Sequence, residues 1–440
     1  MLTALGVGYI VLLLLAFVYI RRRLGFYVMG RTALMGWFWV LCGPPHVYYW
    51  LDGRLDDVIF VRMTVSFSLM WIAFMLTMEL TRLIKPRQFR RADEVARTWR
   101  YMSVAPGYIS KPRLAAICSV SLVFLLWVAI SEHQIGNLIT FIRLQGQTQE
   151  VAIFRGTIGG SKLYAYNVFL SAVAPFLAML LLLTPAPRLA VYTWVRRIFI
   201  VATMLGKVTL FNRSALGLFV VQLLVVKPLL RDNRITARRV AGGVLLVFVL
   251  VLPLFYHFRN DIGSIVTYFA DRISTSLYYG MIPYFRYFPD VAPHAMGRNI
   301  RAINWFWYHG EVYVPPMAVF AQEAGNYYGV FNAAFVAEAW ADFAYPGVFV
   351  ASVLMALTAS LGDLVVFSDG VKTREGAAVL VCMVYGVLLS SQIATQTAMF
   401  SGGLALIPLL AAVLKIVRRR PRPVPPDMET PGLTESPAAT

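Results

Sequence analysis

The stretch of sequence that determines the fold class stands at the start of the chain. It reads LTALGVGYIVLLLLAFVYI at residues 2–20, and three arginines at residues 21–23 follow it directly. A helix needs about 20 apolar residues to cross a bilayer, and this run has that length. Because no small-residue cleavage site follows the run, we interpret it as a retained helix and not as a signal peptide.

Apolar runs of this kind recur along the chain. Of the 440 residues, 59% are hydrophobic and 14% are charged, and the mean hydropathy is +0.66. A soluble domain has about 25% charged residues. The composition therefore favours an all-α polytopic membrane protein, with about eleven transmembrane helices. We place these spans near residues 2–20, 33–50, 59–80, 114–131, 164–184, 198–212, 214–230, 240–257, 347–367, 377–395 and 402–417.

The two spans at residues 198–212 and 214–230 are short. A helix of about 15 residues rises only about 22 Å. The pair could therefore enter and leave the membrane on the same side, or the first helix could begin earlier, near Leu189. A single helix would place the arginines after residue 230 outside the cytoplasm, whereas Lys and Arg are in excess in cytoplasmic loops. We therefore predict two helices.

The formal net charge of +18 comes from Lys and Arg in alternate loops, which include the basic segment 81–113 and the residues that follow Lys415. Cytoplasmic loops carry such an excess. We therefore predict a multi-pass protein of the bacterial inner membrane, with a periplasmic N-terminus, a cytoplasmic C-terminus and no nucleic acid partner. Residues 1–420 would form one integral membrane domain. Residues 421–440, rich in Pro, Thr and Glu, would form a disordered cytoplasmic tail.

Two predicted periplasmic loops are long, at residues 132–163 and 258–346, and all five histidines fall on this side. A loop as long as the second one is expected to fold, so we predict a large, partly helical periplasmic loop before the ninth span. Its segment 262–288 has apolar residues at helical spacing, followed by a cluster of Tyr and Phe. This pattern is typical of a helix in the membrane interface, with its aromatic rings at headgroup depth.

The segment LCGPPH at residues 41–46 predicts a break in the second span, because proline lacks a backbone N–H and clashes with the preceding turn. Such breaks are tolerated in membranes where they line a cavity. His46 could line that cavity, or it could be a histidine whose hydrogen bonds are satisfied locally.

Six cations are candidates for binding a phosphate group, which guanidinium binds through two parallel hydrogen bonds. Arg298 and Arg301 are three residues apart and would share one face of a helix. The alternatives are solvated loop arginines and, near the spans, side chains that snorkel to the interface. The six are Lys207 within a predicted span, Arg213 at its end, and Arg259, Arg272, Arg298 and Arg301 in the second loop.

Two carboxyl groups are candidates for proton transfer. Glu338 and Asp342 are four residues apart in FVAEAWADF at residues 335–343, so they would lie on one helix face. Apolar surroundings disfavour the charged form of a carboxyl group, which suits a general base or acid. The alternative is that both acids pair with arginines and only hold the loop. His309, flanked by Trp305 and Trp307, is a further catalytic candidate.

Metal and disulfide chemistry have no pattern in the sequence. Cys42, Cys118 and Cys382 all lie inside apolar runs, and no pair of histidines has the helical spacing of a metal site. We therefore predict no metal site and no cofactor.

Three stretches of the second half carry a resemblance to a known family. They are KVTLFNRS at residues 207–214, NAAFVAEAWADFAYPG at residues 332–347, and the arginine-bearing loop before the latter. With the many apolar spans and the large late loop, the chain resembles the bacterial oligosaccharide repeat-unit (O-antigen type) polymerases. These are related to the lipid-phosphosugar-dependent membrane glycosyltransferases. Ala344 stands where the family pattern has a glycine after the phenylalanine.

The resemblance implies an activity and a set of roles. Undecaprenyl-diphosphate-linked oligosaccharides would be donor and acceptor, and the polymer would be O-antigen, capsule or exopolysaccharide. Glu338, Asp342 and His309 would be catalytic, the six cations would bind the diphosphate, and no metal would be required. Partners would be the lipid bilayer, a chain-length regulator and a flippase. The alternatives are an O-antigen ligase-like glycosyltransferase, a polysaccharide or lipid transporter, and a non-catalytic assembly partner.

Overall fold

The computed structural model confirms the all-α prediction over the residues that it describes. Within these ranges the chain forms no strand, and extended segments pair only in the isolated bridges Tyr27–Arg234 and Val104–Lys372. The described residues are 2–144, 164–185, 190–209, 213–236, 238–239, 241–243, 245, 263, 277–300, 303–310, 313–325 and 331–419. The predicted tail at 421–440 and most of the predicted span 240–257 lie outside them.

Five helices of the described chain are long and apolar enough, by length and composition, to cross a membrane. This is the composition of a membrane protein, and it covers five of the predicted spans. The five are α1 with the π-helical turn η1 (Leu2–Tyr19, Ile20–Leu24), α4 (Asp57–Ile84), α6 (Lys111–Ser131), the continuous run of α9, η3 and α10 (Tyr164–Val168, Phe169–Val173, Ala174–Leu183), and α19 (Phe335–Phe367).

Other predicted spans are shorter or begin elsewhere. The first helix of the short pair begins at Ala190 and not at residue 198, near the earlier start that we had considered. Further helices are α2 (Gly30–Cys42), α3 (Pro44–Leu51), α5 (Pro86–Thr98), α7 (Gln134–Arg143), α11 (Ala190–Thr209), α12 (Arg213–Arg231), α15 (Leu277–Tyr279), α16 (Ile282–Tyr287), η5 (Asn304–Tyr308), α18 (Pro315–Ala324), α20 (Arg374–Leu389), α21 (Thr395–Met399) and α22 (Leu406–Arg419).

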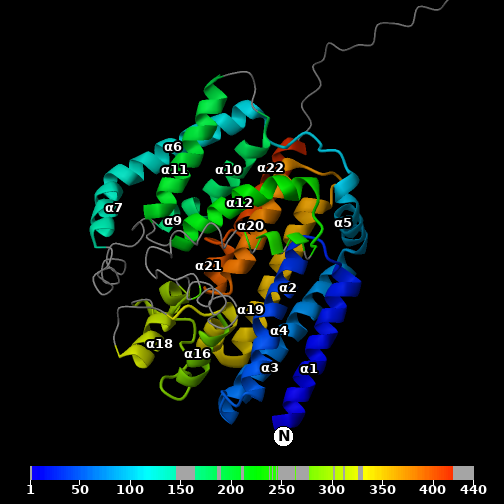
Figure 1. Cartoon of the computed structure of the whole chain (residues 1–440), viewed down its shortest axis with the longest axis vertical. Helices are drawn as coiled ribbons and strands as arrows, with labels where there is room; N and C mark the ends of the chain where they lie inside the picture. Colours follow the sequence, from blue (N-terminus) through cyan, green and yellow to red (C-terminus); the bar gives the residue numbers. More distant parts are fainter. Residues whose placement is uncertain are drawn as a thin grey trace, which may run out of the picture.

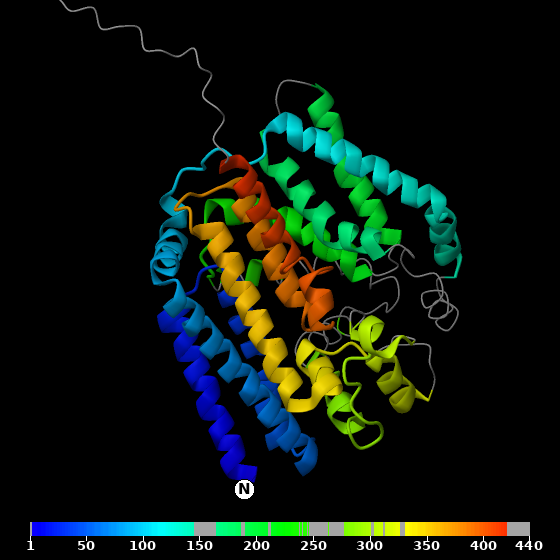
Figure 2. The same cartoon turned by 180° about the vertical axis from the view of Figure 1, so that it is seen from behind.

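Helix α19 lies at the centre of the bundle. It packs along α4, and α2, α20 and α22 also pack against it (Figures 1 and 2). The N-terminus, α3, α16, α18 and the start of α19 lie toward one end, which we call the Glu338 end. Helix α5 and the end of α22 lie toward the other, which we call the Lys415 end. Since α19 runs from the Glu338 end toward the Lys415 end, the number of a residue on α19 tells how far it lies from each end of the bundle.

A buried charge network locks α19 to the N-terminal helices at the Lys415 end. The Arg31 guanidinium lies 2.8 Å from Asp363 and 2.9 Å from Asp93, and the backbone N–H of Gly30 donates to Asp363 at 2.6 Å. Asp363 has no exposed surface, and Arg31 is only 2% exposed. Charges this deeply buried need paired, hydrogen-bonded partners. Asp363 was not singled out from the sequence, although an acid within a predicted span is a recognisable signal.

The predicted break at Gly43 and Pro44 separates α2 from α3, and His46 beside it is fully buried. Its Nδ1 lies 2.7 Å from the Tyr278 hydroxyl, and its Nε2 lies 2.8 Å from the Thr64 hydroxyl. Because Thr64 donates its own proton to the Phe60 carbonyl at 2.6 Å, His46 must donate from Nε2 and accept at Nδ1. His46 is thus the locally satisfied histidine of our second alternative, and it ties α15 to α3 and α4.

Four rings of the aromatic cluster at 278–288 lie in the core and not on the surface, as the interfacial prediction would require, whereas Tyr279 is 52% exposed. Tyr278, Tyr284, Phe285 and Phe288 have no exposed surface. Their polar atoms are satisfied inside the protein, since the Tyr284 hydroxyl donates to the Phe331 carbonyl at 2.8 Å. These rings therefore belong to the core that supports α19. Residues 264–276, which carry most of the predicted helix, lie outside the described residues.

Candidate functional site

Helix α19 is interrupted after its first two turns. Phe343 and Ala344 have non-helical backbone angles, and Ala344 adopts φ 53° and ψ −141°. Pro346 explains the position of the break, because it has no N–H to donate to the carbonyl of Asp342 and its ring clashes with that carbonyl. The freed carbonyls of Ala341 and Asp342 accept instead from the backbone N–H groups of residues 295 and 296, at 2.8 and 2.9 Å.

The loop that caps the break is fitted closely to it. Gly297 has φ +86°, and a Cβ at this position would lie 2.9 Å from the Phe343 ring. The Trp340 indole N–H donates to the Phe288 carbonyl at 3.1 Å, and its ring lies 5.1 Å from that of Phe285. The short segment 335–342 is therefore held from both sides and presents its side chains in a fixed direction.

A second anchor fixes the start of this loop. The Arg62 guanidinium binds the Asp290 carboxylate through two hydrogen bonds of 2.8 Å, and it also donates to the Phe285 carbonyl at 3.0 Å. The hydrogen bonds from Arg62 hold the pKa of Asp290 below its usual value. The ionised pair thus contributes to the loop at neutral pH, and it is lost only as the pH falls through this lowered pKa.

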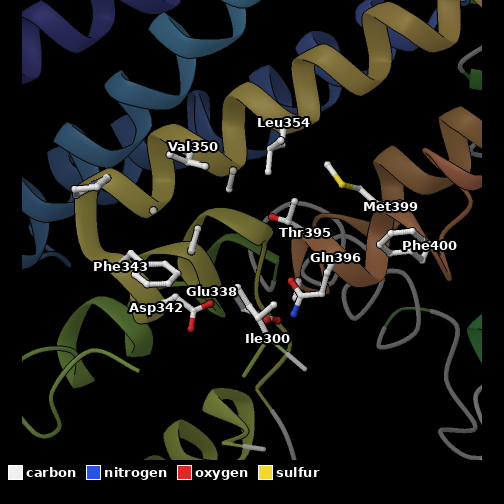
Figure 3. Close-up of a pocket in the computed structure, with 15 residues that line it drawn as sticks. Ile300, Glu338, Asp342, Phe343, Val350, Leu354, Thr395, Gln396, Met399 and Phe400 are labelled. Atoms are coloured by element: carbon white, nitrogen blue, oxygen red, sulfur yellow. The ribbon is translucent and has the colours of Figure 1, made fainter. Parts of the chain in front are cut away.

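The segment borders a cavity of about 480 Å³. Glu338 and Asp342 both line it, as the spacing of four residues predicted, although they are only 6% and 5% exposed. Thr395 and Gln396 of α21 face them across the cavity, while Val350 and Leu354 of the second part of α19 form an apolar wall (Figure 3). The cavity thus combines two carboxyl groups, one amide and one hydroxyl with otherwise apolar surroundings.

The two carboxyl groups differ in their neighbours. Asp342 interacts with the Asn299 side chain and with the backbone amide of Gly297. Among the described residues, no Lys, Arg or His forms an ion pair with either Glu338 or Asp342. Within that part of the chain, the acids are therefore not held in the structural pairs with arginine that were our alternative.

The predicted phosphate-binding cations are not gathered at the cavity in the described structure. Arg298 is exposed above the ring of Tyr308, 5.0 Å from its centroid, and it lies in a turn, so the predicted helix face shared with Arg301 does not form at Arg298. Lys207 is 1% exposed, with its Nζ 3.5 Å from the Ser171 carbonyl, and does not line the cavity. The side chain of Arg213 and the residues Arg259, Arg272 and Arg301 lie outside the described structure.

His309 also lies away from the cavity lining. It is exposed and adopts a left-handed φ of 52° after η5. Sequence reasoning did not find Thr395 and Gln396, which reach the site from the other side. The polar cluster SSQIATQT at residues 390–397 interrupts an apolar run and was the available signal.

The strained conformation at Ala344 yields a stability prediction. A positive φ costs a non-glycine residue roughly 1–3 kcal/mol, and glycine is free of that cost. We expect Ala344→Gly to raise the thermal unfolding midpoint in detergent, and Ala344→Val to lower it. Ala339→Gly, in regular helix four residues before Phe343, is the matched control and should lower the midpoint by the equivalent of about 1 kcal/mol. An equal loss in Ala344→Gly would contradict the strained turn.

Fold and site together define an all-α protein with the apolar helices of a membrane protein and a cavity with two buried carboxyl groups at a helix break. No group of three or more His, Cys, Asp or Glu side chains that could hold a metal ion occurs in the described part of the chain. Comparisons with protein-family models, with curated proteins and with solved structures give no match.

Proposed function

We propose that this protein is a membrane glycosyltransferase that polymerises undecaprenyl-diphosphate-linked oligosaccharide repeat units. The observation that carries the proposal is the placement of Glu338 and Asp342, buried on one face of an interrupted helix and directed into a largely apolar cavity. A carboxylate can accept the proton of a sugar hydroxyl, and apolar walls suit the lipid that carries the donor. The residue pattern of 332–347 supports the same activity.

In the proposed reaction, a hydroxyl of the acceptor sugar attacks the anomeric carbon of the donor. The bond from that carbon to the lipid diphosphate breaks, and the diphosphate leaves with the bonding electrons. Glu338 accepts the hydroxyl proton, and Asp342, held by Asn299, orients the reacting groups. Positive groups of the loop before α19, with Arg298 the nearest in sequence among those described, would stabilise the leaving diphosphate.

The orientation proposed with this function places the Glu338 end in the periplasm and the Lys415 end in the cytoplasm of the inner membrane, with about eleven spans. We expect Val291→Cys to react with an impermeant thiol reagent in intact spheroplasts, and Glu94→Cys to react only after permeabilisation. Both positions are exposed, and the background would lack Cys42, Cys118 and Cys382. The reverse labelling would invert the orientation and remove the site from the periplasm.

The direct test of the function uses purified protein and lipid-linked repeat units from a strain in which the gene is deleted. The proposal requires a ladder of longer lipid-linked glycans. A ligase would need a lipid A core acceptor to give any product. A transporter would move the glycan across vesicles without forming a bond. Folded protein that gives no ladder would overturn the proposal, as would a mutant strain that retains normal polymer.

We expect turnover to continue in EDTA. The described residues hold no cluster of metal ligands, and positively charged side chains can neutralise a diphosphate in place of a divalent ion. The measurement is the rate of ladder formation with EDTA, compared with the rate after Mg²⁺ or Mn²⁺ is added back. If EDTA abolishes activity and either ion restores it, a divalent metal ion, and not the Lys and Arg side chains, neutralises the diphosphate.

A further inference from the structure

A second cavity, of about 540 Å³, lies further along α19 toward the Lys415 end. Its walls come from α19 on one side and, on the other, from Ala405 and from Pro408 and Leu409 of α22. Its rim carries Lys85, Gln88 and Lys415. It is thus apolar along its length and polar where the bundle ends.

Both cavities lie on one face of α19. The first is lined by Gly347, Val350, Ala351 and Leu354, and the second by Thr358, Leu361, Gly362 and Val365. These positions recur at i, i+3 and i+4, which is the spacing of a single helix face. Leu354 and Thr358 are one turn apart, so the two cavities follow each other along the same face of α19.

The floor of this path is made of small residues and its edges of exposed apolar ones. Gly362 brings α19 close to both α20 and α22, since a Cβ there would clash with Cε of Met383 and lie 3.3 Å from Cγ of Pro408. At the edges, Val350, Leu361 and Leu409 are 56%, 43% and 62% exposed. The two cavities thus form two parts of one apolar strip along α19, which we call the groove, and the helices α21 and α22 run beside it (Figure 2).

The length of the groove restricts what can fill it. From Gly347 to Val365 a helix rises about 27 Å, which is close to the roughly 30 Å hydrocarbon core of a bilayer. The acyl chains of a phospholipid occupy one leaflet, or about half of that core. A single chain that follows the whole groove must therefore be a much longer hydrocarbon.

We infer that this groove, residues 347–365 of α19 with α21 and α22, binds the polyprenyl chain of the lipid-linked donor, and that its diphosphate end lies at the cavity of Glu338. The inference rests on the proposed function, because it takes the donor to be an undecaprenyl-linked glycan. The groove would then select donors by the length of their hydrocarbon chain, which the two carboxyl groups cannot do. The chain would also place the anomeric carbon at a constant height beside Glu338.

The first experiment compares two donors that carry the same glycan, one on undecaprenyl diphosphate and one on geranyl diphosphate. Burial of the longer chain should give the wild-type protein a kcat/KM that is at least about tenfold higher for the undecaprenyl donor. Thr358→Trp, which fills the middle of the groove, should abolish that preference by lowering kcat/KM for the undecaprenyl donor to about the value for the geranyl donor. Val123→Trp on α6, which replaces a side chain that is 67% exposed, is the matched control and should keep the preference.

A second measurement does not depend on catalysis. In the background without native cysteines, Leu361→Cys should be protected from N-ethylmaleimide by undecaprenyl phosphate, but not by geranyl phosphate or phosphatidylglycerol. Val123→Cys should not be protected by any of them. Equal protection by phosphatidylglycerol, or no protection by undecaprenyl phosphate, would contradict the proposal that the groove binds a polyprenyl chain. Protection without any glycan ladder would instead retain the groove and reject the proposed function.

Discussion

Replacement of Glu338 by glutamine should lower the rate of glycan elongation by roughly 10²–10⁴-fold, with little change in KM for the lipid-linked donor. Glutamine has nearly the same size and keeps much of the hydrogen bonding, but it cannot accept a proton. Glu338 lies at the cavity without an ion-pair partner among the described residues, so its charge is not needed to hold a described cation in place. The measurement is the initial rate of ladder formation by purified protein.

The control for this substitution is Glu323→Gln on α18. Glu323 lies 3.5 Å from Arg286 in an exposed pair, and exposed pairs contribute only about 0–1 kcal/mol. That variant should elongate glycans at close to the normal rate. If Glu338→Gln, folded and present at the normal level, also elongates at the normal rate, then Glu338 is not the base. A loss of folded protein would instead indicate a structural role.

Replacement of Asp363 by alanine should cost roughly 3–5 kcal/mol of stability, the largest structural effect that we expect. Arg31 is 2% exposed and would keep only Asp93 as an ionic partner, while two backbone N–H groups would lose their acceptor. The measurement is the free energy of unfolding in denaturant with a mild detergent, together with the protein level in membranes.

Two further variants separate charge burial from packing. The double variant Arg31→Leu with Asp363→Leu removes both charges and should recover part of the lost stability, because no unpaired guanidinium remains and Asp93 keeps Arg82 as its partner at 3.3 Å. The part not recovered is that of the two backbone N–H groups without an acceptor. Asp52→Ala breaks the exposed pair with Arg54 and should change stability by less than about 1 kcal/mol. If Asp363→Ala is as mild as Asp52→Ala, the network does not lock α19 to the N-terminal helices.

The helical nature of the chain and several helix positions followed from local pattern alone. The sequence predicted a helix at 2–20, a break at Pro44, and a shared helix face for Glu338 and Asp342. All three are found in the described structure. Each depends on residues a few positions apart. Helix periodicity and the missing N–H of proline act over that same short range.

Tertiary structure decided what lies opposite these residues. Thr395 and Gln396 face Glu338 across the cavity, and Asp363 meets Arg31 across 332 residues of chain. Four of the aromatic rings of 278–288 are buried in the core. Sequence patterns over a few residues cannot predict such contacts, because the contacts depend on how helices far apart in sequence pack together. The groove along α19 is of the same kind. The spacing of 347–365 defines a face, but only the approach of α21 and α22 makes that face a binding site.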